Sequence, residues 1–560
     1  MKEFLKKLNL WLTASGFGIS LFIPLVLLSF FFSIGGEPIS RILFNADILY
    51  FPVLYKDIFI NGYHLDGWNI PGAPNFFPDM LVYFFLMYLS NSVPVSMFLF
   101  AFFQLLTILL LFKYIVKLTF PQISLYPVML GNLLLSLFFM VTFIDNEPYI
   151  SFHLVSNTYH LGTFVNALIA LLLALRFLIT GKPIYLIVFA LLGTLAFVSD
   201  RLFIILFCLP FTGAILLFVR KKENFRKLLS LAIALFVIVA AGLIIFDRIT
   251  HNHTIHLAKA YFDINLNGIT NSWKSLFYNL SVYFSDFKIF TLIICISILG
   301  LAISIYMLIR SFREIWKGFL IKDGLPEMMN TFFVLFMLIV FFTPVFTGSF
   351  QGFDTIRYNI FVFYLGLMFF GVLLVKLFHQ NSMIKKTVKV SSLALSLILT
   401  IYIGIYLVRN KPATGFKEFF AYYPEISQCI DSMDVKYELK HGLTTYWLGK
   451  PGTLFSKRDV RLYTVYDENL VPYSHVGNEN WYYETGYGKY DPPLFNFLIL
   501  QLPLSENSLE TIKNRVGEII AMEEYGKFVF LLCNDFKYSR QNHFPELLEN
   551  TTEITEILAQ

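Results

Sequence analysis

Long apolar stretches recur along the first 408 residues of the chain and then stop. A helix that crosses the hydrocarbon core of a bilayer needs about 20 predominantly apolar residues. Stretches of that kind are centred on residues 14–34, 94–116, 124–144, 161–180, 184–199, 202–219, 228–246, 288–309, 328–347, 359–378 and 389–408. The pattern predicts an α-helical polytopic membrane protein with about eleven transmembrane helices.

The pattern changes after Arg409, where polar and apolar residues become mixed. Alternating or short apolar runs typical of strands occur in this region, at 462–466, 494–502 and 527–533. Such runs beside a helical stretch indicate a small α/β domain. We therefore predict two domains, a transmembrane bundle over 1–408 and a soluble α/β domain over 409–560.

Composition excludes a soluble protein. The chain is 57% hydrophobic and 14% charged, whereas soluble domains carry about 25% charged residues. The 18% aromatic content is typical of packing and interfacial anchoring in a bundle and says little about chemistry. The net charge of +5 does not predict a nucleic-acid partner, because the basic residues cluster in particular loops.

Those basic clusters predict the orientation of the bundle. They are Lys2, Lys6 and Lys7; Lys113 and Lys117; Arg176 and Lys182; Arg220, Lys221, Lys222, Arg226 and Lys227; Arg310, Arg313, Lys317 and Lys322; and Lys385, Lys386 and Lys389. Short cytoplasmic loops carry an excess of basic residues, so the alternation places the N-terminus in the cytoplasm. An odd number of spans then places residues 409–560 outside. We expect a bacterial inner membrane and an uncleaved first helix.

The first outer loop, residues 35–78, is long and acidic. Ionisable groups held near a membrane are costly unless they are paired or functional. Asp47 follows the first helix directly and is therefore a candidate for chemistry, although a solvated charge is an equal alternative. Asp57 is interpreted as a surface charge beside Lys56.

Residues 79–89 form an apolar segment that is too short to span a bilayer. An interfacial or re-entrant helix fits this length and would roof a cavity beside the first helix. Asp79 begins the segment, either as a side chain of that cavity or as the N-terminal cap of the helix.

Further candidates lie in later outer loops. His153 and His160 are too far apart for the close histidine pair of a zinc protease and lack its intervening Glu, so no metal site is predicted. His160 can bind a phosphate or a sugar hydroxyl, or make a structural hydrogen bond. Asp200 and Arg201 are adjacent, and they either neutralise one another or lie in a cavity.

Arg357 is the only basic residue of its outer loop and stands where a helix begins, in FDTIRYNIF. Its planar set of donors suits a lipid phosphate. The alternative is an ion pair with Asp354. In the C-terminal domain, Cys429 and Cys533 form a disulfide or remain free thiols; the sequence does not distinguish these.

The order of features resembles the GT-C superfamily of polyprenyl-phosphate-sugar-dependent glycosyltransferases, which includes the protein O-mannosyltransferase and aminoarabinose transferase families. The likeness rests on Asp47 after the first helix, the long outer loop, the FFPDMLVYFFLMYL segment, the acids of the second outer loop and the pair Arg357-Tyr358. It covers about residues 10–408. It does not extend to the C-terminal domain or include the paired acidic motif of several members.

The resemblance implies an inverting transfer at the outer face from a polyprenyl-phosphate-linked sugar to a glycan, lipid or protein acceptor. Asp47 would be the catalytic base. The substrate site would be lined by Asp79, His160, Arg201, Arg357 and Tyr358. No cofactor is required beyond the lipid-linked donor; a divalent cation between Asp47 and the acids Asp145 or Glu147 is the alternative, without support from the sequence.

Two other functions compete with a transferase. A lipid or glycan transporter also needs a polytopic bundle, but such proteins usually show internal repeats and ionisable groups at the midplane. A scaffold that presents residues 409–560 would not need Asp47. Aromatic residues around Trp481, in WYYETGYGKY, are a candidate for binding an acceptor sugar.

Overall fold

The computed structural model describes most of the chain, namely residues 2–34, 36–63, 65, 68–218, 225–251, 256–257, 264–285, 288–316, 324–378, 381–410, 412–439, 441–458, 460–466, 469–473, 475–478 and 493–538. The chain divides into two compact units. The helical unit comprises Met1–Ile39, Ala73–Phe246 and Ala260–Phe419. The mixed unit comprises Ser40–Gly72, Asp247–Lys259 and Phe420–Gln560. Most of the first outer loop therefore groups with the C-terminal residues.

Nine helical stretches of the described chain are long and apolar enough to cross a membrane. They lie in α1 (Lys2–Ser33), α5 (Val93–Thr119), α6 and α7 (Tyr126–Leu135 and Leu137–Asp145), α9 (Leu161–Thr180), α12 (Phe225–His251), α14 (Ile289–Trp316), α15 (Gly324–Phe346), α16 (Ile360–Leu377) and α17 (Ser382–Asn410). Each coincides with a predicted span, which confirms a polytopic α-helical protein. The other two predicted spans fall on shorter apolar helices, α10 (Pro183–Ser199) and η2 with α11 (Ile204–Cys208 and Leu209–Phe218).

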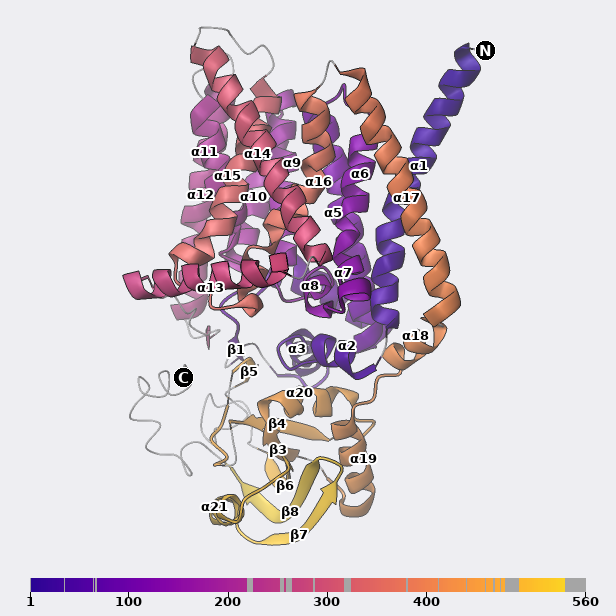
Figure 1. Ribbon diagram of the computed structural model, residues 1–560. Helices are drawn as coiled ribbons and strands as arrows, with labels where there is room; N and C mark the ends of the chain where they lie inside the picture. The colour runs from indigo at the N-terminus through magenta and orange to yellow at the C-terminus, as the bar shows by residue number, and fades with distance from the viewer. Residues whose placement is uncertain are drawn as a thin grey trace. The chain divides into compact units, whose positions relative to one another are not determined.

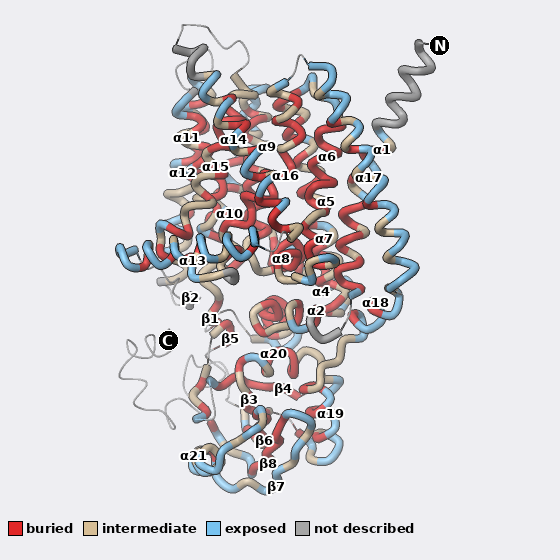
Figure 2. Tube along the Cα trace, in the orientation of Figure 1, coloured by how far each residue is buried: buried red, intermediate tan, exposed pale blue. Residues whose placement is uncertain are grey.

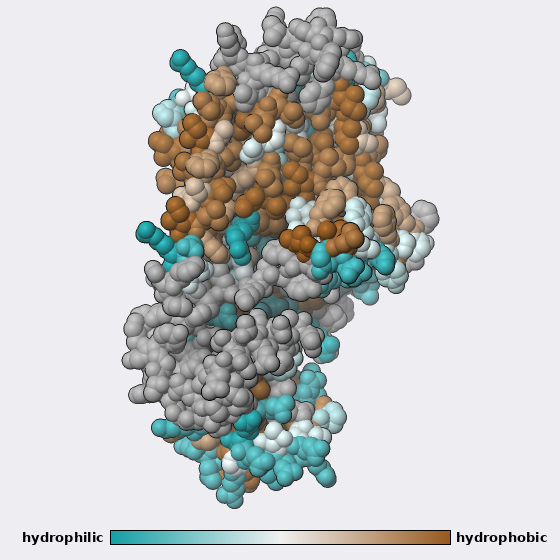
Figure 3. Space-filling view, turned by 90° about the vertical axis from the view of Figure 1, so that its left-hand side faces the viewer, coloured by the Kyte–Doolittle hydropathy of each residue, from teal (hydrophilic) through white to brown (hydrophobic). Residues whose placement is uncertain are grey.

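The interior of the helical unit is built around α6 and α16, which pack against each other. The apolar span containing α6 is 89% buried, whereas that of α17 is 11% buried. Figure 2 shows the same contrast between the inner and outer helices. Gly131 lets the two inner helices approach, because a Cβ at this position would overlap the Met368 carbonyl. The outer helices present a largely apolar surface (Figure 3), as expected for contact with lipid.

Short elements gather at the end of the helical unit away from Lys2, the start of α1. There, α13 (Leu266–Ser285) lies across the bundle (Figure 1) and packs against α14 and α15, and α8 (Pro148–Phe152) packs against α7. Further short helices are α2 (Gly36–Leu43), η1 (Phe76–Met80), α4 (Leu81–Ser90), η3 (Phe353–Tyr358) and α18 (Pro412–Phe420). The apolar segment predicted over residues 79–89 is thus helical, as part of η1 and α4.

The mixed unit contains a five-stranded sheet with strand order β4-β3-β6-β8-β7. The strands are β3 (His441–Thr445), β4 (Arg461–Val465), β6 (Leu494–Gln501), β7 (Ile519–Tyr525) and β8 (Phe528–Lys537). β3 is parallel to both β4 and β6, and β8 is antiparallel to β6 and β7. The predicted strand runs all fall on strands of this sheet, which confirms an α/β region.

Helices and a small second sheet complete the mixed unit. The helices are α3 (Tyr50–Phe59), α19 (Glu425–Tyr437), α20 (Tyr446–Phe455) and α21 (Glu506–Val516). A three-stranded sheet joins β1 (Trp68–Ile70), β2 (His256–Leu257) and β5 (Gly477–Asn478). Cys429 and Cys533 are buried free thiols, so the alternative of a disulfide is wrong.

Candidate functional site

Four of the predicted site residues come together in the helical unit, at the ends of helices. We define the polar cluster as Asp79, His153, His160, Thr163, Asp200, Arg357 and Tyr358. Its members come from five separate segments, and hydrogen bonds, ring contacts or electrostatic interactions join each to another. The sequence indicated Asp79, His160, Arg357 and Tyr358 as site residues but not that Asp200 would connect them.

Asp200 is the centre of the hydrogen bonding in the polar cluster. It follows α10 and is 3% exposed. Its Oδ2 accepts a hydrogen bond from Thr163 Oγ1 at 2.5 Å and lies 2.7 Å from His160 Nδ1, while its Oδ1 accepts from the backbone N–H of Leu202 at 2.9 Å. Because three partners satisfy this carboxylate, it is held in one orientation.

Arg201 does not neutralise its neighbour Asp200, so the adjacent-pair interpretation is wrong. The Arg201 side chain is exposed and lies over the Phe246 ring, 4.7 Å from the centroid. Asp200 pairs with His160 instead, which is 40 positions away in sequence. Arg201 is therefore outside the polar cluster, although the sequence placed it in the substrate site.

His160 occupies a special backbone position at the start of α9. It is the N-cap residue, with φ of 63° in the left-handed region. Its Nδ1 faces Asp200 and its ring is 5.4 Å from the Tyr358 ring. In the tautomer that carries the proton on Nδ1, this N–H donates to the Asp200 carboxylate. Nε2 then remains as an acceptor.

Asp79 is directed into the helical unit and does not cap a helix, so the capping alternative is wrong. It lies inside the helix formed by η1 and α4, is 2% exposed, and accepts a hydrogen bond from Gln104 Nε2 at 3.4 Å. Its carboxylate touches the start of α9, because a Cβ at Gly162 would overlap it. The positive end of that helix suits a carboxylate.

The backbone around Asp79 is fixed by α9 and α10. The N–H groups of Asn75 and Phe77 donate to the carbonyl and hydroxyl of Ser199, at 3.0 and 2.9 Å. Asn166 donates its side-chain N–H to the Phe77 carbonyl at 3.0 Å. The segment that carries Asp79 is thus tied to the residue before Asp200.

Arg357 is a cation surrounded by aromatic rings. Its guanidinium lies 5.4 Å from the centroid of Tyr159 and 5.0 Å from that of Tyr358, and Nη2 donates to the Tyr358 hydroxyl at 3.2 Å. Its Nε is buried and has no hydrogen-bond partner in the described part of the chain. Within the same residues no carboxylate forms an ion pair with it. The side chain of Asp354, the alternative partner, lies outside the described residues.

His153 is a second buried group with unused hydrogen-bonding capacity. It is 1% exposed and lies against the rings of Tyr149 and Tyr159. Burial, with smaller contributions from Arg357 and His160, lowers the pKa of His153 to about 3, so the ring is neutral. Neither ring nitrogen has a partner among the described residues. Buried polar atoms are normally paired, so a polar ligand is the expected partner.

Asp47 belongs to the mixed unit and has two neighbours from α20. Tyr446 donates its hydroxyl to Asp47 Oδ1 at 2.5 Å. Lys450 is 5% exposed and donates to the Ala46 carbonyl at 2.8 Å and to the Tyr446 hydroxyl at 3.3 Å. Burial lowers the pKa of Lys450 to about 7, against the opposing effect of Asp47. Asp47 is half-buried, not a freely solvated charge.

Asp57 is buried and paired, so its interpretation as a surface charge is wrong. Its Oδ1 lies 2.5 Å from Arg461 Nη2, and its side chain is 1% exposed. Burial raises the pKa of Asp57, and the Arg461 guanidinium opposes the shift. Because Arg461 is on β4, this pair ties α3 to the five-stranded sheet. No pattern in the sequence indicated a partner 404 positions away.

The acids considered for a cation have other contacts. Glu147 Oε1 lies 3.1 Å from Lys288 Nζ, and Asp145 accepts backbone hydrogen bonds from the start of α14. In the residues that the structure describes, no group of three His, Cys, Asp or Glu side chains is placed to hold a metal ion. Trp481 and its aromatic neighbours lie outside the described residues.

Comparisons with known proteins give matches at the level of structure. No protein-family model matches the sequence, and the search of curated proteins finds no match. The chain is similar to the crystal structure of ArnT from Cupriavidus metallidurans bound to undecaprenyl phosphate, with a TM-score of 0.47 and 11% identity over 91% of this chain and 97% of that one. It is also similar to the apo structure of the same protein, with a TM-score of 0.45 and 10% identity over 93% and 98%.

These two neighbours are structures of one protein, ArnT, and both have TM-scores below 0.5. At such identities and TM-scores the likeness concerns overall architecture. It assigns neither a residue role nor a substrate to this chain.

Proposed function

We propose that this protein is a membrane glycosyltransferase that moves a sugar from a polyprenyl-phosphate-linked donor to an acceptor at the outer face of the membrane. The observation that carries the proposal is Arg357, a guanidinium among aromatic rings that no described carboxylate neutralises. A partly buried cation without an anion is costly, so an anionic ligand is expected there.

The polar cluster suits a phosphate attached to a sugar. The fixed fork of a guanidinium matches phosphate oxygens and can form two parallel hydrogen bonds with them. His153 adds a neutral ring beside Arg357, and His160 adds further hydrogen-bonding capacity. Asp79 supplies carboxylate oxygens that suit a sugar hydroxyl, whereas Asp200 orients His160. The cluster thus offers positive charge for the phosphate and hydrogen bonding for the sugar.

The lipid part of the donor is proposed because the polar cluster belongs to the unit that carries the apolar membrane-spanning helices. The helical unit exposes large apolar side chains along α10, α12 and α17, among them Leu191, Phe236 and Leu397. A water-soluble sugar nucleotide has no apolar chain to place beside these side chains. A polyprenyl chain remains in the hydrocarbon region while its phosphate reaches the helix ends, because transferring its apolar surface to water is unfavourable.

The proposed reaction is an inverting displacement. The acceptor hydroxyl oxygen forms a bond to the anomeric carbon, and the bond from that carbon to the phosphate oxygen breaks. Asp47 takes the hydroxyl proton, and polyprenyl phosphate leaves with the electron pair. Arg357 stabilises the charge that develops on the departing phosphate. Tyr446 holds the Asp47 carboxylate in position through its 2.5 Å hydrogen bond.

We propose no cofactor beyond the lipid-linked donor. The acceptor is a glycan, a lipid or a protein. The proposal retains a bacterial inner membrane, with the N-terminus in the cytoplasm and the C-terminal residues outside, on the basis of the alternating basic loops. Arg201 has no role in this scheme, because its side chain is exposed against Phe246.

The test is a transfer assay with the purified protein in lipid vesicles and a panel of polyprenyl-phosphate sugars. Released polyprenyl phosphate and glycosylated acceptor are measured for wild type and for Asp47→Asn. We expect transfer by wild type and a fall of about 10²–10⁴-fold in the variant, the range of general base catalysis. The matched control is Asp535→Asn, an exposed carboxylate of β8 in the same unit, which should leave the rate unchanged.

Other outcomes have distinct meanings. Equal rates in wild type and Asp47→Asn would exclude Asp47 as the base while leaving the transferase standing. If folded wild type transfers no sugar from any donor of the panel but moves a labelled lipid-linked sugar across the vesicle membrane, the protein is a transporter and the proposal is wrong.

A further inference from the structure

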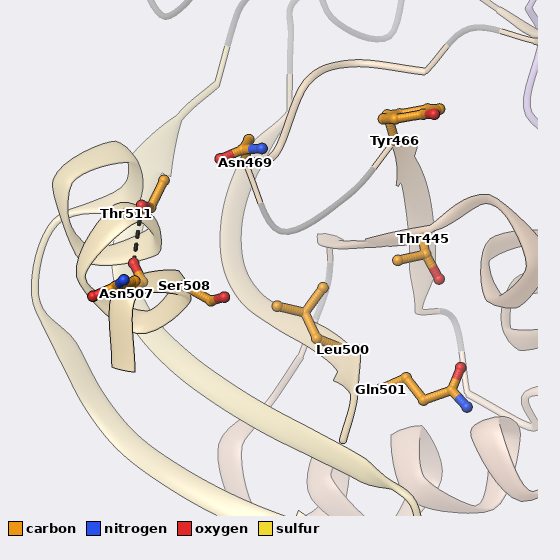
Figure 4. A pocket seen from close by; sticks show the side chains of 8 residues that line it. All are labelled: Thr445, Tyr466, Asn469, Leu500, Gln501, Asn507, Ser508 and Thr511. Atoms are coloured by element: carbon orange, nitrogen blue, oxygen red, sulfur yellow. Dashed lines mark hydrogen bonds between the residues drawn. The ribbon is translucent and has the colours of Figure 1, made fainter. Parts of the chain in front are cut away.

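The mixed unit contains a pocket of about 430 Å³ at one edge of its five-stranded sheet. Figure 4 shows its lining: α21 contributes side chains on one side, and the strand ends contribute them on the other. The lining residues are Thr445, Tyr466, Asn469, Leu500, Gln501, Asn507, Ser508 and Thr511. Asp47 and its neighbours Tyr446 and Lys450 are not among these residues, so the pocket is separate from the surroundings of Asp47.

The register of the sheet explains why these residues meet. Parallel pairing aligns Thr445 with Val465, and Thr444 with Ile499. The residues at or just beyond these positions, Thr445, Tyr466 and Leu500, therefore lie at the same edge. That edge is formed by the carboxyl ends of three parallel strands, where ligands of open α/β sheets usually bind.

The helix on the other side presents polar side chains to the pocket. Thr511 Oγ1 donates to the Asn507 backbone carbonyl at 3.0 Å (Figure 4), which orients the Thr511 hydroxyl. In the described part of the chain, the side-chain amides of Asn507 and Gln501 make no hydrogen bond. Each amide offers donors and an acceptor to a ligand.

The lining is polar but uncharged. Seven of its eight residues carry a hydroxyl or an amide, and the eighth, Leu500, is a buried apolar residue at the strand end. Tyr466 is 46% exposed and supplies an aromatic face. Hydroxyls and amides both donate and accept, whereas an aromatic face suits an apolar patch of a ligand. A sugar ring has both kinds of surface.

An anionic ligand fits this pocket poorly. Among the described residues, no lysine, arginine or histidine lines it. The first turn of α21 carries Glu506, and the Ser505 side chain already accepts from the Ser508 N–H at 3.0 Å. The chain after β3 continues as Tyr446-Trp447-Leu448 and lacks the glycine-rich turn that cradles phosphates. These features disfavour a nucleotide or a free phosphate.

We propose that this pocket binds a neutral saccharide, as part of the acceptor. That the saccharide is part of the acceptor rests on the proposed transferase function, whereas saccharide binding itself does not. A volume of about 430 Å³ lies within the range of about 300–1,000 Å³ for small-molecule sites. One or two sugar residues are thus the expected size.

The test is saturation-transfer NMR on the full-length protein in nanodiscs, without donor lipid. The probes are glucose, galactose, mannose and N-acetylglucosamine and their disaccharides, with inorganic phosphate as the anionic probe. We expect at least one saccharide to bind and phosphate not to compete. The variants Asn507→Ala and Gln501→Ala should each weaken binding at least fivefold. The control is Asn514→Ala, an exposed amide of α21 that does not line the pocket.

Binding that is equal in wild type and both pocket variants would overturn the proposal, as would competition by phosphate or the absence of saccharide binding to folded wild type. The transferase proposal fails in a different way. If sugar transfer is absent while the pocket variants still weaken saccharide binding, the pocket stands and only its connection to an acceptor is lost. Transfer without any saccharide binding would remove the pocket and leave the transferase.

Discussion

Two arginines, one in each unit, lie among tyrosine rings and differ in what neutralises them. Arg461 in the mixed unit contacts Tyr63 and Tyr463 and forms an ion pair with buried Asp57 at 2.5 Å. Arg357 in the helical unit contacts Tyr159 and Tyr358 but has no ion pair within the described side chains. The same aromatic surroundings therefore serve two purposes.

We infer from this difference that Arg461 has a structural role and that Arg357 is available to bind a ligand. An ion pair completed inside the protein holds two segments together, and its charges are already satisfied. Arg357 has no anion and the His153 nitrogens have no partner among the described side chains, so this region keeps its capacity for an anion from outside. Burial alone would not have distinguished the two arginines; the completeness of their pairing does.

The largest effect is expected from breaking the pair in the mixed unit. Asp57→Asn leaves Arg461 without its counter-charge, so we expect the free energy of unfolding to fall by about 3–5 kcal/mol, as for other buried pairs. Chemical denaturation of the purified protein measures this. The double variant Asp57→Leu with Arg461→Met should recover most of the loss, because no charge is then left buried. A double variant as unstable as the single one would contradict this explanation.

The second effect concerns Arg357 and should appear in activity rather than stability. Arg357→Gln removes the positive charge but keeps hydrogen-bond donors. We expect kcat of sugar transfer to fall by about 10²–10³-fold, as when a donor to developing negative charge is lost. The melting temperature should change little, because no ion pair among the described side chains is broken. Arg310→Gln, an exposed arginine on α14, is the control. A large loss of stability with retained kcat would make Arg357 structural.

The smallest effect concerns Lys450, a third buried cation, which contacts Asp47 only through Tyr446. Its pKa is lowered from 10.5 to about 7 by burial. Between these values the unfolded chain holds a proton that the folded protein lacks, so stability should rise with pH from 7 towards 10, by at most about 1.4 kcal/mol per unit. Thermal unfolding at several pH values measures the slope. Lys450→Met should remove the slope, and the control Lys537→Met, on β8, should keep it. An unchanged slope in Lys450→Met would show that the pH dependence of stability does not arise from Lys450.

Part of the polar cluster was predictable because its charged residues stand next to long apolar segments. Arg357-Tyr358 and Asp79 stand where apolar segments begin, and His160 precedes α9. Their local positions are a property of the sequence. Asp200 was harder to interpret, because its nearest neighbour in sequence, Arg201, is not its partner in space.

Asp57 shows why the rest was not predictable. Beside Lys56 it looks like a surface charge, and only the folding of β4 against α3 brings Arg461 to it. The same holds for Lys450, which reaches the backbone next to Asp47 from α20. Pairings across several hundred residues leave no periodic trace in the sequence.

The sequence by itself determined the transmembrane helices and the α/β region, because apolar length and alternation are local properties. It also placed the ionisable residues at the ends of those helices. The tertiary structure decided which of these charges are satisfied inside the protein and which remain available for a ligand. That outcome depends on contacts between segments distant in the chain, and the free energy of a charge depends on its neighbours in space.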